Sequence, residues 1–169
     1  PNGMDSFEKE ISAAFSNSKI PFVDYGLTRS GAISLKGIFR HSDFPILSQN
    51  KNKLFRMASM TKPLTAYLTL AVLEDNAIDL QESVGNYVPE IDNLQIAYME
   101  RDVIKYRKND VPISFHHLLS CTSGHAYEHH EPIVSELISK KESPPVKNGD
   151  DAFLKAPLVF KPGSRWGYG

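Results

Sequence analysis

The chain has 169 residues, of which 41% are hydrophobic and 23% charged, a composition typical of one globular domain. Its 19 Lys and Arg residues balance 20 Asp and Glu residues, and the net charge of -1 lacks the basic excess of nucleic-acid-binding proteins. The longest nearly apolar stretch, residues 66–73, is far shorter than the roughly 20 residues of a membrane span. One cysteine, Cys121, excludes an internal disulfide. We therefore expect neither a nucleic-acid partner nor a membrane-spanning helix.

Three residues, Pro1-Asn2-Gly3, precede Met4 and resemble the remnant of an expression tag, so one domain is expected over 4–169. Residues 4–55 are expected to form a helix and a β-hairpin, and residues 56–169 a helical region with long loops. The residues after Met4 alternate charged and hydrophobic side chains instead of forming the apolar run of a signal peptide. This pattern favours a cytoplasmic location.

Near the N-terminus, Phe7, Ile11 and Phe15 recur every four residues and predict an amphipathic helix that ends before Pro21. Asp5 and Glu8 have the spacing of a capping box for it. Two extended runs follow, at 22–28 and 32–40, separated by Arg29-Ser30-Gly31, and they predict a β-hairpin.

The strongest helix prediction covers Ser59 to about Asn76, with Pro63 near its start. Its apolar positions at helical spacing are Met60, Leu64, Leu68, Ala71 and Val72. Asp79 is placed to cap a short segment that runs to Pro89.

The charged, aperiodic residues 98–112 are expected to run over the surface. Ser114 then caps a predicted short helix that closes at residues 122–124. Six of the eleven prolines lie within 112–169, so this third is expected to be mostly loop with one short helix near 150–156.

The first candidate for chemistry is Ser59 followed three residues later by Lys62. This spacing occurs four times, and the other matches are Ser6/Lys9, Ser16/Lys19 and Ser48/Lys51. Only Ser59 combines a helix start with an apolar segment behind it, which would desolvate Lys62 and lower its pKa toward that of a base. The unpaired N–H groups of the first turn would also favour developing negative charge. The plainer alternative is that Ser59 caps the helix and Lys62 is a solvated charge.

The segment 55–63, Phe-Arg-Met-Ala-Ser-Met-Thr-Lys-Pro, resembles the active-site segment of serine hydrolases of the class C β-lactamase and penicillin-binding-protein family. That family includes family VIII carboxylesterases and related acyltransferases. Further resemblances follow in the same order at 76–90, at 113–124 and at 160–168, the last a Pro-Gly-x-x-Trp-x-Tyr sequence. The resemblance extends from about Pro21 to Gly169.

This resemblance implies an α/β (α+β) fold, with an antiparallel sheet flanked by helices plus a helical region. It implies Ser59 as nucleophile, Lys62 as general base and Tyr168 as a second proton-transfer group. The Ser59 backbone N–H would contribute to the oxyanion site, and Trp166 would contact the substrate. A Lys ammonium next to Tyr168 would favour its phenolate. No cofactor or metal ion is implied.

The sequence departs from the family pattern at two places. Cys121 stands where a His is common, and we interpret it as a buried small side chain. The chain ends one residue after Tyr168, before the later strand that lines the family's site. We therefore expect an N-terminal portion of a larger enzyme, with C-terminal sheet strands missing and a complementary C-terminal polypeptide as a partner. The 169 residues alone should be a poor catalyst.

A rival pattern is His125-Ala-Tyr-Glu128-His129, which matches an inverted zinc motif. Pro132 and Gly124 leave scarcely two turns for a helix there, so zinc hydrolysis is a remote alternative. The acidic pairs, including Asp150-Asp151, fit caps and solvated faces better than acid/base pairs.

We predict a serine hydrolase that forms an acyl-enzyme, a carboxylesterase or acyltransferase acting on a small ester or amide. Two further alternatives stay open at this point. One is a β-lactamase or D-Ala peptide hydrolase, and the other is a catalytically inactive binding module.

Overall fold

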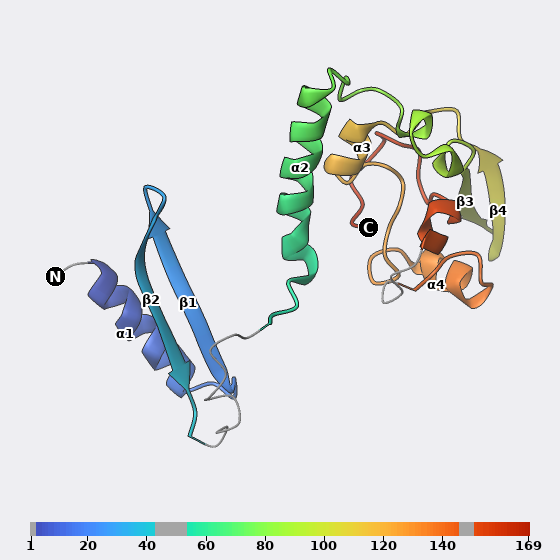
Figure 1. Cartoon of the computed structure of the whole chain (residues 1–169). Helices are drawn as coiled ribbons and strands as arrows, with labels where there is room; N and C mark the ends of the chain where they lie inside the picture. The colour runs from blue at the N-terminus through green and yellow to red at the C-terminus, as the bar shows by residue number, and fades with distance from the viewer. Residues whose placement is uncertain (1–2, 43–53, 146–150) are drawn as a thin grey trace. The chain divides into compact units, whose positions relative to one another are not determined.

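The computed structural model describes residues 3–42, 54–145 and 151–169, which form two compact units, Pro1–Met57 and Ala58–Gly169 (Figure 1). In the first unit, helix α1 (Gly3–Ser16) lies against a hairpin of strands β1 (Phe22–Arg29) and β2 (Ala32–Arg40). The hairpin prediction is confirmed. Its turn residues Ser30 and Gly31 both have positive φ, 51° and 78°, as a two-residue hairpin turn requires.

Aromatic side chains hold α1 on the hairpin. Phe15 is buried on α1 and stacks on Phe39 of β2 with ring centroids 5.8 Å apart. The Tyr25 hydroxyl of β1 donates a 2.7 Å hydrogen bond to Glu8. The first helix is therefore confirmed, although it begins two residues before Asp5, which corrects the prediction that Asp5 starts it.

In the second unit, a single 3-10 turn, η2 (Ala58–Met60), leads into helix α2 (Thr61–Asp75). The helix prediction is confirmed. The expected buried stripe is wrong, because Leu64, Leu68 and Val72 are exposed and Leu73 is the buried residue. Apolar residues surround the helix instead of following one face, a pattern typical of helices enclosed by a protein core.

The rest of this unit packs around two apolar clusters. Short 3-10 helices η3 (Val84–Asn86) and η4 (Pro89–Ile91) and helix α3 (Phe115–Leu119) border the larger one. As predicted, Ser114 caps α3, with its hydroxyl accepting from the His117 N–H. The larger cluster contains Val84, Ile91, Leu94, Ile96, Ile113 and Leu158.

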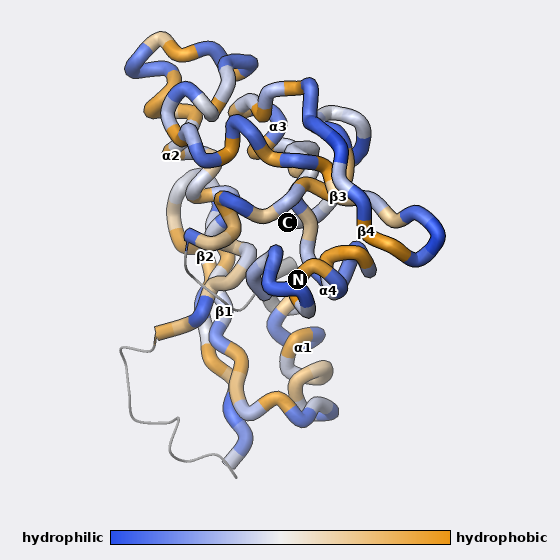
Figure 2. Tube along the Cα trace, turned by 90° about the vertical axis from the view of Figure 1, so that its right-hand side faces the viewer, coloured by the Kyte–Doolittle hydropathy of each residue, from blue (hydrophilic) through white to orange (hydrophobic). Residues whose placement is uncertain are grey.

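Residues 98–112 lie mostly on the surface, as expected, but they include two strands that were not predicted. Strands β3 (Gln95–Glu100) and β4 (Val103–Lys108) pair antiparallel, and Leu158 bridges to Ile96. The charged turn between these strands is blue in Figure 2. Ile104 of β4 joins Ala97 and Leu137 in the smaller cluster, so these strands contribute to the core.

The described part of the C-terminal third is mostly loop, as predicted, but it contains one helix that was not predicted. Helix α4 (Pro132–Ser139) begins at Pro132, where proline is favoured because the first helical N–H needs no partner. A 3-10 helix, η5 (Asp151–Lys155), occupies the position predicted for a short helix. The described residues contain no helix long and apolar enough to cross a bilayer.

Candidate active site

The candidate nucleophile lies on the turn that leads into α2. Ser59 is exposed, and it follows Ala58, whose φ of 46° is unusual for a residue other than glycine. Met60, rather than Ser59, is the N-cap of α2, and no side chain caps the helix. The interpretation of Ser59 as a capping residue is therefore not supported. The backbone at this position leaves first-turn N–H groups without intrahelical acceptors.

Lys62, in the first turn of α2, faces two tyrosines from later in the chain. Its Nζ lies 4.7 Å from the ring centroid of Tyr168 and 5.6 Å from that of Tyr127. The two tyrosine rings meet edge to face, with centroids 5.7 Å apart. Trp166, which is 60% exposed to solvent, stacks on the Tyr168 ring with centroids 5.9 Å apart. The fold thus gathers one amine and three aromatic rings next to the start of α2.

Backbone pairing of two segments fixes the position of Tyr168. The N–H of Tyr127 donates to the Tyr168 carbonyl at 2.9 Å, and the N–H of Gly167 donates to the Cys121 carbonyl at 2.9 Å. Gly124 lies between these bonds with a φ of 101°, and a Cβ there would lie 2.5 Å from the Phe160 carbonyl oxygen. The pairing therefore requires glycine at this position.

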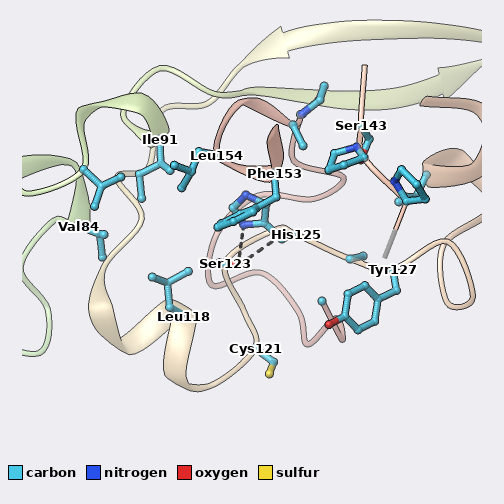
Figure 3. A pocket seen from close by; sticks show the side chains of 18 residues that line it. Val84, Ile91, Leu118, Cys121, Ser123, His125, Tyr127, Ser143, Phe153 and Leu154 are labelled. Carbon is cyan, nitrogen blue, oxygen red and sulfur yellow. Dashed lines mark hydrogen bonds between the residues drawn. The ribbon is translucent and has the colours of Figure 1, made fainter. Parts of the chain in front are cut away.

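The segment 121–127 also contributes the half-buried His125 to a cavity (Figure 3). His125 Nδ1 lies 3.1 Å from the Ser123 hydroxyl, and burial lowers the His125 pKa to about 4. Cys121, predicted to be buried, is half-buried and lines the same cavity. The imidazole is neutral at pH 7.

The zinc alternative receives no support from this geometry. His129 is exposed, and residues 125–129 form no helix that would present both imidazoles on one face. Within the described part of the chain, no group of three or more His, Cys, Asp or Glu side chains could hold a metal ion.

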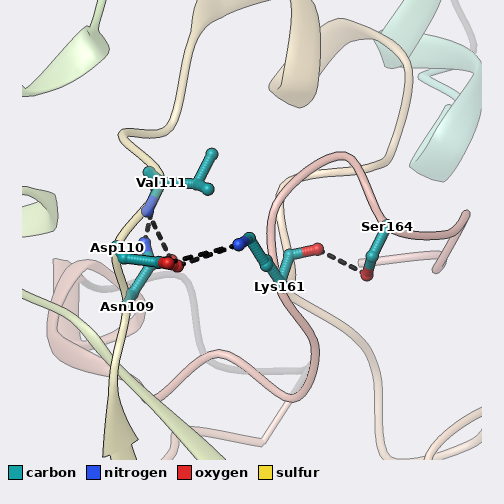
Figure 4. Close-up of polar contacts among 5 residues, drawn as sticks. All are labelled: Asn109, Asp110, Val111, Lys161 and Ser164. Carbon is teal, nitrogen blue, oxygen red and sulfur yellow. Dashed lines mark hydrogen bonds and ion pairs between the residues drawn. The ribbon is translucent and has the colours of Figure 1, made fainter.

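A polar contact anchors the loop that precedes Trp166 (Figure 4). Lys161 Nζ lies 3.1 Å from an oxygen of Asp110, just after β4, and its hydrogen bond holds the pKa of that carboxyl below its ordinary value. The Ser164 hydroxyl donates to the Lys161 carbonyl at 2.6 Å. The Asn109 side-chain amide nitrogen donates to the Val111 carbonyl at 2.7 Å. This hydrogen bond restricts the backbone turn that carries Asp110.

Arg165 adds a second anchor to the same loop. Its guanidinium lies 2.5 Å from Glu131 and 4.1 Å from the centroid of the Phe160 ring. An ion pair and a cation–π contact on one side chain restrict the loop directly before Trp166.

Among the predicted site residues, the structure brings Lys62, Tyr168 and Trp166 together, with Ser59 three residues before Lys62. The oxyanion role of the Ser59 N–H stays a prediction. The sequence interpretation missed Tyr127, because its place opposite Lys62 depends on pairing between distant segments. An aromatic residue shortly after Thr-Ser-Gly was the one available signal.

The sequence profile of the Beta-lactamase family matches residues 31–169. The ML-236A carboxylate methylbutanoyltransferase mlcH of Penicillium citrinum is 31% identical over 117 residues, which cover 68% of this chain and 28% of that protein. The acyltransferase calJ of Penicillium decumbens is 31% identical over 123 residues, 69% of this chain and 28% of that protein. The chain thus spans about 28% of the length of these relatives.

Two solved structures share the fold. Unliganded simvastatin synthase (LovD) from Aspergillus terreus, as its selenomethionyl derivative, superposes with a TM-score of 0.71 and 23% identity, covering 100% of this chain and 44% of that one. EstCE1, a hydrolase with promiscuous acyltransferase activity, has a TM-score of 0.67 and 19% identity, covering 94% of this chain and 41% of that one.

Proposed function

Since the chain belongs to the Beta-lactamase family, we propose that the protein it forms part of is a serine acyltransferase or carboxylesterase for small esters. The family and its β-lactamase/transpeptidase-like fold confirm the resemblance found in the sequence, with this chain as a partial fold. The observation that carries the proposal is the contact of the Lys62 amine with the Tyr168 ring beside the Ser59 turn. Relatives named as acyltransferases support the reaction class.

In the proposed reaction, Ser59 Oγ attacks the ester carbonyl while its proton passes to the Lys62–Tyr168 pair. The tetrahedral oxyanion is stabilised by the Ser59 N–H on the preceding 3-10 turn together with free N–H groups at the start of α2. The intermediate collapses as the carbon–oxygen bond to the leaving alcohol breaks, and the pair returns the proton to that alcohol. The product of this half-reaction is an acyl group on Ser59.

The second half-reaction repeats these steps with a new nucleophile. An acceptor hydroxyl, or water in the esterase reaction, gives its proton to the pair and attacks the acyl carbonyl. Ser59 then leaves and recovers its proton. The exposed ring of Trp166, stacked on Tyr168, offers an apolar wall for the substrate.

The proposal includes a complementary C-terminal polypeptide that covers α2. Leu68 is 62% exposed and Tyr67 72% exposed on this helix, although a helix that is apolar all round is ordinarily enclosed. The relatives extend well beyond the length that this chain matches, so a longer polypeptide is available in such proteins to cover it. Burying each such side chain would contribute about 1.5–3 kcal/mol.

Labelling with a fluorophosphonate tests the nucleophile. In the complete protein we expect one adduct, on Ser59, and loss of both adduct and p-nitrophenyl ester hydrolysis in Ser59→Ala. Ser16→Ala is the matched control, because Ser16 also precedes a lysine by three residues but lies on α1. An unlabelled Ser59, or full activity in Ser59→Ala, would leave the inactive binding module as the better interpretation.

A comparison of substrates tests the reaction class. We expect a short p-nitrophenyl ester to be turned over faster than nitrocefin, and an added alcohol to divert the acyl group from water. Faster nitrocefin hydrolysis would favour the β-lactamase alternative.

A further inference from the structure

The cavity next to His125 has a volume of about 470 Å³, within the range of small-molecule sites, and lies within the second unit. Apolar side chains dominate its described lining, among them Val84, Ile91, Leu118 and Phe153 (Figure 3). A cavity lined in this way favours a hydrocarbon ligand.

One polar atom in this lining has no partner. His125 Nε2 is inaccessible to solvent and makes no hydrogen bond to any described residue. A buried polar atom without a partner costs about 1–3 kcal/mol, so a ligand that satisfied it would recover part of that free energy. Unpartnered buried groups are rare and call for an explanation.

The tautomer of the ring determines which kind of atom would satisfy Nε2, and the proposal takes the one in which Ser123 donates to Nδ1. The Ser123 hydroxyl oxygen accepts from the His125 backbone N–H at 3.4 Å, which leaves its hydrogen free to be donated to Nδ1 at 3.1 Å. With Nδ1 acting as acceptor, the neutral ring carries its proton on Nε2, which is then a donor. The complementary ligand atom is an oxygen acceptor.

We propose that this cavity binds a neutral, mainly hydrocarbon molecule or group with one carbonyl or ether oxygen, which accepts a hydrogen bond from His125 Nε2. Tyr127 lines the cavity, and its ring also faces the Lys62 amine. The ligand is either the hydrocarbon part of the ester substrate, which rests on the proposed function, or a separate small molecule with the same chemistry.

Two matched probes test the site in the full chain: 4-phenylbutan-2-one and butylbenzene, which differ by a carbonyl in place of a methylene. NMR titration of the labelled histidines should show saturable binding of both probes, a shift of the His125 Nε2 resonance with the ketone only, and about 2- to 10-fold tighter ketone binding. His125→Phe should remove this preference while the ring volume is nearly kept.

A cavity-filling variant provides the second test, which does not depend on the folding of His125→Phe. Ala126 lines the cavity, so Ala126→Leu should weaken both probes at least 10-fold, whereas Ala13→Leu on the exposed face of α1 should not. The proposal is overturned if the wild-type chain binds neither probe, if ketone and hydrocarbon bind equally, or if Ala126→Leu leaves binding unchanged.

The two sources of the ligand are separated by kinetics in the complete protein. Competitive inhibition of ester turnover by the ketone indicates the substrate's hydrocarbon part, and non-competitive or absent inhibition indicates a separate ligand. Ser59→Ala should still bind the ketone. An active Ser59→Ala with normal ketone binding would overturn the proposed function and leave the cavity site intact.

Discussion

The Lys62 amine lies 4.7 Å from the ring centroid of Tyr168, although α2 begins the second unit and Tyr168 is next to its last residue. A cation over an aromatic face at this distance contributes about 0.5–2 kcal/mol, depending on how far it is desolvated. The contact places an amine and a phenol side by side, the two groups that the proposed reaction uses for proton transfer.

Removing either member of this pair should impair acyl transfer in the complete protein. We expect Lys62→Ala and Tyr168→Phe each to lower kcat/KM for a p-nitrophenyl ester about 10²- to 10⁴-fold, the range for general acid–base groups. The double variant should be little worse than the single ones, because groups that act as a unit are not additive. Lys19→Ala, in the unrelated Ser16/Lys19 pair, is the control, and a fully active Tyr168→Phe would contradict the assignment.

His125 should make the chain sensitive to acid. Its folded pKa of about 4 lies below the ordinary value of 6.5, so the unfolded chain takes up the proton first as the pH falls. The free energy of unfolding should therefore be constant above about pH 6.5 and decrease by about 3 kcal/mol toward pH 4. Urea titrations at several pH values measure this loss.

A histidine on the surface serves as the control for this dependence of the unfolding free energy on pH. His125→Phe should remove most of the pH dependence between 6.5 and 4, and His129→Phe, at an exposed position, should not. Equal slopes in the wild type and His125→Phe would show that the His125 imidazole is not the group that titrates.

Gly124→Ala should disrupt the pairing that positions Tyr168. A Cβ at this position would lie 2.5 Å from the Phe160 carbonyl oxygen, and the backbone has a φ of 101°. We expect a loss of at least about 2 kcal/mol in unfolding free energy and a larger loss of activity than stability alone explains. Gly26→Ala on β1 has space for a Cβ, with the nearest atom 3.9 Å away, and should cost under about 1 kcal/mol.

Substitutions of two leucines of α2 test whether its exposed side chains become buried by further polypeptide in the complete protein. In the isolated chain, Leu68→Gln at a 62% exposed position should change the unfolding free energy by less than about 0.5 kcal/mol, and Leu73→Gln at a 6% exposed position should cost about 2–5 kcal/mol. In the complete protein Leu68→Gln should become costly. A large cost in the isolated chain would mean that the outer side of α2 is already buried there.

The fold could be predicted where local patterns were strong. The turn at Ser30-Gly31 and the helix cap at Ser114 depend only on residues next to them in the sequence. Both were therefore predicted correctly. Strands β3 and β4 were missed because Ile96 and Ala97 are both buried, which breaks the alternation expected of a strand. Pro132 was treated as the end of a helix, whereas it begins one.

The site was predicted from family motifs more than from physical chemistry. Ser59 and Lys62 share one turn, so spacing alone could suggest them, but Tyr168, Trp166 and Tyr127 meet through tertiary pairing. Nothing in the local sequence indicates that His125 turns into a cavity. Contacts of this kind depend on the whole chain being folded.

The hydrogen bonds between residues 121–127 and the C-terminal segment have a consequence for engineering. Anyone who grafts the Trp-x-Tyr stretch into another scaffold would have to transplant its partner segment as well. In a library that randomises one of these two segments and keeps the other fixed, most variants would hold the Trp166 and Tyr168 rings in the wrong position.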